Sequence, residues 1–137
     1  MTKAYEKVSH EILLSKLYGM GVRGLAHKWF QSYLHNRKQY VEIDYFDKEC
    51  KQVNVITSEM RYITCSIPQG SVCGCLLFLA YINDLPVALN PNTTCVMFAD
   101  DVSLLLNCKN STECNLQLSH TFEVTQKWLS DHNLEIN

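Results

Sequence analysis

Two adjacent acidic residues between two apolar runs constrain this chain more than any other feature of its sequence. The runs Cys95–Ala99 and Val102–Leu106 are apolar and β-prone, and only Asp100 and Asp101 separate them. This pattern predicts a tight β-hairpin with a carboxylate pair at its tip. Two-residue hairpin turns normally carry Asn-Gly or Asp-Gly, because those residues tolerate positive φ. Two like charges repel each other there, so the pair is either a solvated acidic turn or a site for a cation.

Composition and net charge limit the size of the protein and the partners it attracts. The chain has 137 residues, of which 47% are hydrophobic and 19% charged, as expected for one globular domain or part of one. Because its formal net charge is -2, a polyanionic partner needs a local basic patch. The cluster His35–Lys38 is one candidate, although positive charges that favour a helix C-terminus explain it equally well.

The cysteines and the apolar runs indicate the cellular setting. Seven cysteines without a zinc-ligand spacing indicate reduced thiols, mostly small core residues, rather than a disulfide framework or a zinc site. The sequence shows no secretory signal pattern, and its longest apolar run, Cys75–Ile82, is too short to span a bilayer. We therefore expect an intracellular protein without a membrane segment, in either the cytoplasm or the nucleus.

Periodicity and turn residues predict an α+β fold with a small antiparallel sheet packed against helices. Helices are expected over 8–18, ending at Gly19, over 24–35, closed by Asn36, and over 112–132. A half-buried strand is expected over 40–46, followed by strands over 53–56 and 62–65. The segment 72–85 is apolar almost all round, which predicts a buried helix.

A loop with glycine precedes that apolar helix and is the second candidate site. In Gln69-Gly70-Ser71, the glycine breaks regular structure and Ser71 suits a helix N-cap. Such a loop is either a simple capped helix start or an anion site, because unpaired N–H groups and the helix dipole favour negative charge. Together with the carboxylate hairpin, it would provide phosphate recognition and a divalent-cation site, the equipment of phosphoryl transfer.

Four blocks in order resemble the palm of a reverse transcriptase from a non-LTR (LINE-type) retrotransposon. These blocks are Ala4–His10, Ile67–Val72, Leu77–Pro86 and Phe98–Asp101, and together they cover nearly the whole chain. The resemblance implies that residues 1–137 form a partial reverse transcriptase domain, without the first catalytic strand, the fingers and the thumb. It also implies RNA-directed DNA synthesis, in which an RNA template, a DNA primer and a deoxynucleotide are the partners.

The resemblance assigns roles to particular residues. Asp100 would be a metal ligand and Asp101 its partner, in a mechanism with two Mg²⁺ ions roughly 4 Å apart, which Mn²⁺ could replace. Gln69, Gly70 and Ser71 would lie where the family contacts template, primer and nucleotide. Tyr5 would be the aromatic residue below the nucleotide sugar, where a planar ring excludes a 2′-hydroxyl.

One departure from the family bears on activity. The other essential carboxylate of the family is an Asp five residues before Tyr5, which falls one position ahead of Met1. We therefore expect residues 1–137 to have negligible polymerase activity on their own. The alternative is a non-catalytic remnant that acts through RNA or protein interactions. Helices without their fingers and thumb neighbours would expose Trp29, Phe30 or Trp128, whereas the low net charge predicts weak nucleic-acid binding.

Overall fold

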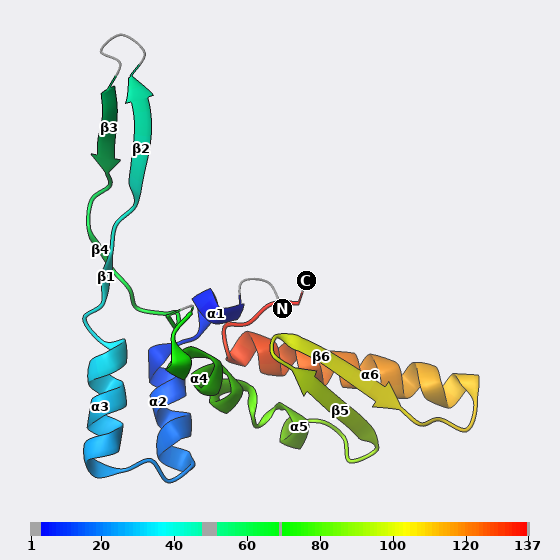
Figure 1. The fold of residues 1–137 in the computed structure, drawn as a ribbon. Coiled ribbons are helices and arrows are strands. Elements are labelled where there is room, and N and C mark those ends of the chain that lie inside the picture. Colours follow the sequence, from blue (N-terminus) through cyan, green and yellow to red (C-terminus); the bar gives the residue numbers. More distant parts are fainter. Residues whose placement is uncertain (1–3, 48–51, 69, 137) are drawn as a thin grey trace.

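The computed structural model describes residues 4–47, 52–68 and 70–136, and it confirms the α+β class (Figure 1). The elements follow one another as α1 (Ala4–Lys7), α2 (His10–Gly19), α3 (Gly24–Leu34), β1 (Lys38–Gln39), β2 (Glu42–Asp47), β3 (Gln52–Thr57), β4 (Arg61–Tyr62), α4 (Val72–Ile82), α5 (Leu85–Ala88), β5 (Thr93–Phe98), β6 (Asp101–Leu106) and α6 (Ser111–Asp131). The strands form three separate antiparallel pairs, β1–β4, β2–β3 and β5–β6.

Local signals account for the ends of the main helices. Hydroxyl or amide side chains cap three of them, because Ser9, Ser71 and Asn110 accept hydrogen bonds from the backbone N–H groups of Ile12, Gly74 and Glu113. The helix α2 ends at Gly19 and α3 is followed by Asn36, as expected, and Asn36 takes a positive φ of 58°.

The core lies where α2, α4 and the C-terminal half of α6 meet. Its fully buried side chains come from segments far apart in the sequence, namely Val8, Leu13, Leu34, Ile67, Phe78, Tyr81, Ile82 and Leu85. Trp128 and Leu129 of α6 join this cluster. Burial of each large apolar side chain contributes about 1.5–3 kcal/mol, so this junction fixes α4, and with it the loop before α4, relative to the rest of the chain.

The predicted acidic hairpin forms, with its turn one residue earlier than expected. In β5–β6, Thr93 pairs with Leu106 and Phe98 pairs with Asp101, so the two-residue turn is Ala99-Asp100 and Asp101 begins β6. Ala99 has a positive φ of 52°, which two-residue hairpin turns require. One face of the ribbon is half-buried, with Cys95 and Met97 opposite Leu104 and Val102.

A second hairpin contradicts the expected burial. The alternating segment 40–46 does form a strand, β2, but β2 and β3 make a ribbon that projects away from the helices (Figure 1). Ile43 and Phe46 lie on opposite faces of this ribbon and are 60% and 59% exposed. The alternation of apolar and polar residues predicted the strand because successive side chains of a strand point to opposite faces. It does not report whether another element covers either face.

Three further expectations, one about a helix end and two about burial, were wrong. The helix α4 ends at Ile82 rather than Leu85, since Pro86 lies in the first turn of the separate short helix α5. It buries one face only, and Val72 is 90% exposed. The six described cysteines are free, as expected, but they are half-buried or exposed rather than in the core, and Cys50 lies outside the described residues.

The tryptophans divide between surface and core. Trp29 is exposed, as expected, and Phe30 is half-buried. Trp128 is only 7% exposed, contrary to expectation. Its ring stacks on the His132 ring with centroids 3.9 Å apart, and the Lys16 Nζ atom lies 4.9 Å from the Trp128 ring centroid. In the part of the chain that the structure describes, no helix is long and apolar enough to cross a membrane.

Candidate functional site

The two aspartates line a hollow between the β5–β6 hairpin and α6. Asp100 in the turn and Asp101 at the start of β6 both line a cavity of about 340 Å³ between β6 and α6. Its other walls are largely apolar and include Leu104, Leu118 and Phe122. The aspartates therefore border an apolar space on the α6 side. Charges interact more strongly next to an apolar medium than in open water, so this position favours a nearby positive charge.

Tyr5 of α1 packs against α4. Its ring stacks on Phe78 of α4 with centroids 4.6 Å apart and an interplanar angle of 21°. Burial raises the pKa of Tyr5, and a hydrogen bond with the Cys75 side chain and electrostatic interactions with Cys75 and Asp100 raise the pKa further. The Asp100 carboxylate is therefore close enough to Tyr5 for their charges to interact. Tyr5 therefore joins α1 to α4, and the charge of Asp100 in the hairpin turn acts on it.

The loop before α4 is tied to the segment that carries Tyr5. The Ile67 N–H donates to the Tyr5 carbonyl at 2.9 Å, and the Ser66 N–H donates to the Val8 carbonyl at 2.9 Å. Gly70 has a positive φ of 76°, a conformation that side chains other than glycine rarely adopt. The two hydrogen bonds hold the Ser66–Ile67 end of the loop and the Tyr5 segment in one unit. Gln69 lies outside the described residues.

The Ser71 hydroxyl is engaged in hydrogen bonds within the protein. It accepts from the Tyr33 hydroxyl at 3.1 Å and from the Gly74 N–H at 3.0 Å, and it donates to the Pro68 carbonyl at 2.9 Å. These three bonds cap α4, close the loop and connect both to α3. They shape the loop from within the protein, and a contact between Ser71 and a nucleotide stays a prediction.

Sequence reasoning missed Cys75 and Phe78, the two α4 residues that hold Tyr5. Their helical spacing from Ser71 was a usable signal, because residues three and four apart lie on one face of a helix. Ser71, Cys75 and Phe78 follow one another at such intervals. The residues brought together are thus Tyr5, Cys75, Phe78 and Asp100.

The ligands at the hairpin tip are of the kind that a hard divalent cation prefers. There are too few of them to fill its coordination sphere. Mg²⁺ and Mn²⁺ prefer carboxylate oxygens, and both aspartate residues line one cavity, with Asp100 half-buried and Asp101 exposed. Among the described residues, no group of three or more His, Cys, Asp or Glu side chains is placed to hold a metal ion. The residues present therefore fit two protein ligands of a magnesium site, with the remaining positions left to water, to substrate or to other ligands.

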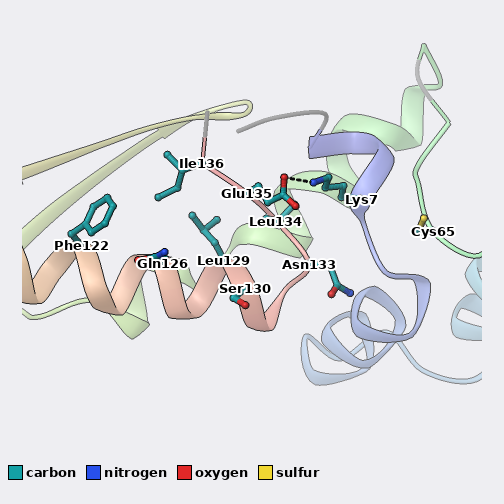
Figure 2. A pocket seen from close by; sticks show the side chains of 10 residues that line it. All are labelled: Lys7, Cys65, Phe122, Gln126, Leu129, Ser130, Asn133, Leu134, Glu135 and Ile136. Carbon is teal, nitrogen blue, oxygen red and sulfur yellow. Dashed lines mark ion pairs between the residues drawn. The ribbon is translucent and has the colours of Figure 1, made fainter.

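A larger hollow lies at the C-terminal end of α6. It has a volume of about 840 Å³, and Figure 2 shows Phe122, Gln126 and Leu129 of α6 together with Leu134 and Ile136 of the following segment. An ion pair between Lys7 and Glu135 crosses it (Figure 2). None of the predicted site residues lines this hollow, so its size does not make it the candidate site.

A half-buried ammonium group links the three core helices. Lys16 of α2 donates to the Tyr81 carbonyl and to Asp84, and the Tyr81 hydroxyl donates to the His132 carbonyl at 2.7 Å. Burial lowers the pKa of Lys16, and the hydrogen bond and charge of Asp84 oppose this change. Because these contacts join α2, α4 and the end of α6, we interpret the cluster as structural.

Comparison with known proteins identifies the family. The model of the reverse transcriptase (RNA-dependent DNA polymerase) family matches residues 1–137, and the chain belongs to this family. A relative from Drosophila melanogaster, the RNA-directed DNA polymerase from mobile element jockey, is 24% identical over 141 residues. The match covers 98% of this chain and 14% of that relative, and no solved structure matches. The resemblance to reverse transcriptases of non-LTR retrotransposons is thereby confirmed.

Proposed function

We propose that the chain is a palm segment of the RNA-directed DNA polymerase of a retrotransposon, and that it carries part of the polymerase active site. The observation that carries this proposal is the stack of Tyr5 on Phe78 of α4, together with the charge of Asp100 that acts on Tyr5. Three blocks of the sequence meet there, although Tyr5 and Asp100 are 95 positions apart. The reaction would join a deoxynucleotide to the 3′-hydroxyl of a primer, with release of pyrophosphate, on an RNA template.

In this proposal Asp100 and Asp101 hold magnesium, or manganese in its place. A divalent ion bound there supplies charge neutralisation at the transferred phosphoryl group and activates the primer hydroxyl. Contacts with Phe78 and Cys75 fix the position of the Tyr5 ring. A ring fixed in this way would exclude a nucleotide whose sugar carries a 2′-hydroxyl. Gly70, with the neighbouring Gln69 and Ser71, supplies the backbone that approaches template and nucleotide.

Metal binding tests this assignment without requiring polymerase activity. Titration with Mn²⁺, followed by the electron paramagnetic resonance signal of the free ion, should show a weak site on the 137-residue chain that Mg²⁺ competes for. Asp100→Asn and Asp101→Asn should each weaken it at least about tenfold, because each removes a ligand. Asp44→Asn, on the projecting ribbon, removes the same charge elsewhere and should leave it unchanged. Equal Mn²⁺ affinity in all four proteins would refute the assignment.

Primer extension tests the expectation about activity. With two carboxylates in the described site, residues 1–137 by themselves should extend an RNA-templated primer at least about a thousandfold more slowly than a complete enzyme. Incorporation that approaches that of a complete enzyme and disappears in Asp100→Ala would contradict this expectation, while it would support the role of Asp100.

A further inference from the structure

Two thiols lie together where the β5–β6 hairpin joins α6. Cys108 follows β6 and Cys114 lies in the first turn of α6, so a short loop separates them (Figure 1). Both cysteines are free and half-buried. The Cys108 thiol forms a hydrogen bond with the Cys114 side chain. The two sulfur atoms are therefore neighbours, and neither belongs to the site described above.

A second contact places Cys108 on the same face of α6 as Cys114. The Cys108 Sγ donates to the Gln117 Oε1 at 3.7 Å. Gln117 lies three residues after Cys114, and residues at that spacing are neighbours on the surface of a helix. The position of the Cys108 side chain beside Cys114 thus follows from this contact as well as from the hydrogen bond between the thiols.

Hydrogen bonds hold the loop between the two cysteines against the start of α6. The Asn110 side chain caps the helix and accepts from the Glu113 N–H at 2.8 Å, while the Asn110 carbonyl accepts from the Cys114 N–H at 3.0 Å. The Glu113 carboxylate accepts from the Lys109 N–H at 3.1 Å. Because these bonds form with both thiols reduced, little movement is needed to bring the two sulfur atoms into bonding distance.

The Cys108 thiol is protonated at neutral pH. Partial burial raises its pKa, and a hydrogen bond with Cys114 and electrostatic interactions with Cys114 and Glu113 raise the pKa further. Because the thiolate is the reactive form of cysteine, the pair is stable as two thiols under reducing conditions. A change in its state therefore requires an oxidant.

We propose that Cys108 and Cys114 form a reversible disulfide by exchange with a small-molecule disulfide. One thiol of the pair loses its proton and attacks a sulfur of the small disulfide, which forms a mixed disulfide and releases one small thiolate. The second thiol loses its proton and attacks the protein sulfur of the mixed disulfide, which forms the bond between Cys108 and Cys114 and releases the second small thiolate. The pair thereby loses two electrons, the small disulfide gains them, and the two released thiolates take up the two protons.

This disulfide would fasten the end of β6 to the start of α6. Leu106 is the last residue of β6, and Leu118 lies one turn after Cys114. Both leucines line the hollow that the two aspartates border. The bond would therefore fix the walls of this hollow at the end that lies away from the hairpin turn. The proposed function assigns no role to either cysteine, so the inference is independent of it.

The test is the equilibrium of the 137-residue chain with a glutathione redox buffer at mildly alkaline pH. Acid quenching, alkylation of free thiols and mass spectrometry of tryptic peptides would identify the linkage, because cleavage after Lys109 separates Cys108 from Cys114. The equilibrium constant for closing the disulfide should be at least about tenfold larger in native buffer than in concentrated urea, since the folded loop holds the two thiols together. A constant that is no larger in native buffer would overturn the inference.

The chain supplies its own control pair in Cys73 and Cys75 of α4. These cysteines are closer in sequence, but residues two apart on a helix do not face each other, so the pair should stay unlinked. Cys108→Ser and Cys114→Ser should each abolish the linked peptides, whereas Cys95→Ser should leave the closing constant unchanged. A link between Cys73 and Cys75 that forms as readily, or a link from Cys108 to a different cysteine, would also overturn the inference.

Unfolding provides a readout that does not depend on the peptides. Because linkage is reciprocal, closing the disulfide should lower the equilibrium constant of unfolding in urea by the same factor of about ten. Circular dichroism of the unaltered chain and of Cys108→Ser, each with oxidised or reduced glutathione, would measure this factor. An equal response of the two proteins to oxidised glutathione would contradict a bond between Cys108 and Cys114.

Discussion

Substitution of Gly74 by alanine should disturb the site through packing alone. Gly74 is buried in the first turn of α4, and a Cβ atom built on it would lie 2.7 Å from the Pro68 carbonyl oxygen and 3.0 Å from the Ser71 Oγ. Real Cβ atoms essentially never come as close as the first of these distances. The nearest atom is a backbone carbonyl oxygen that accepts a hydrogen bond from the Ser71 hydroxyl, and not the far end of a flexible side chain that could move aside.

Two opposing effects set the size of the change. Alanine in a helix interior gains up to about 1 kcal/mol over glycine from its better helix propensity. Forcing an extra methyl group into a packed site costs about 1–3 kcal/mol. Because the obstacle is a carbonyl held by the Ser71 hydroxyl, we expect the clash to win and the chain to lose about 1–2 kcal/mol of stability.

Urea unfolding followed by circular dichroism would measure this loss, and Gly19→Ala is the control. A Cβ at Gly19 would meet nothing within 4 Å, and Gly19 is the last residue of α2, so alanine there should be neutral or slightly stabilising. If Gly74→Ala proved as stable as the unaltered chain, the close packing of the loop against α4 would be wrong. A stability loss of the same size in both variants would show that glycine is needed for a reason other than this contact.

Two further predictions concern the hairpin turn and the effect of pH. Ala99→Gly should stabilise the chain by about 0.5–1 kcal/mol in the same urea assay, because glycine adopts the positive φ of this turn without strain; an unchanged or lower stability would contradict the turn geometry. Burial lowers the pKa of His10 below its usual 6.5, although the hydrogen bond that its Nε2 donates to the Ser66 carbonyl opposes this change. The unfolded chain therefore takes up the proton first, and stability should be full above about pH 6.5 and fall as the pH drops below it. His10→Gln should flatten this fall and the exposed His120→Gln should not, and an equal pH dependence in both would refute the role of His10.

Local signals predicted the elements that carry the site. The apolar runs around Asp100 and Asp101 predicted the β5–β6 hairpin, and the serine before the apolar segment predicted the start of α4. These predictions succeeded because period and capping depend on neighbours in the sequence. The turn lies one residue early because Asp101 pairs with Phe98, which leaves Ala99 to take the positive φ that was expected of an aspartate.

Burial and side-chain partners could not be predicted in the same way. Trp128 is covered by Lys16 from α2, more than a hundred residues earlier, and no local pattern reports that contact. The hydrogen bond between Tyr5 and Cys75 likewise depends on how α1 docks against α4. The β2–β3 ribbon is the converse case, since a regular alternation suggested a covered face that no described element covers.

The central claim is that Asp100 and Asp101 hold a divalent ion beside Tyr5. The most direct measurement is nuclear magnetic resonance of the 137-residue chain, with labelled tyrosine and cysteine, during addition of substoichiometric Mn²⁺. The account predicts that the signals of Tyr5 and Cys75 broaden first, and that Asp100→Asn together with Asp101→Asn abolishes this selective effect. Broadening that spares Tyr5, or that persists unchanged in the doubly substituted chain, would contradict it.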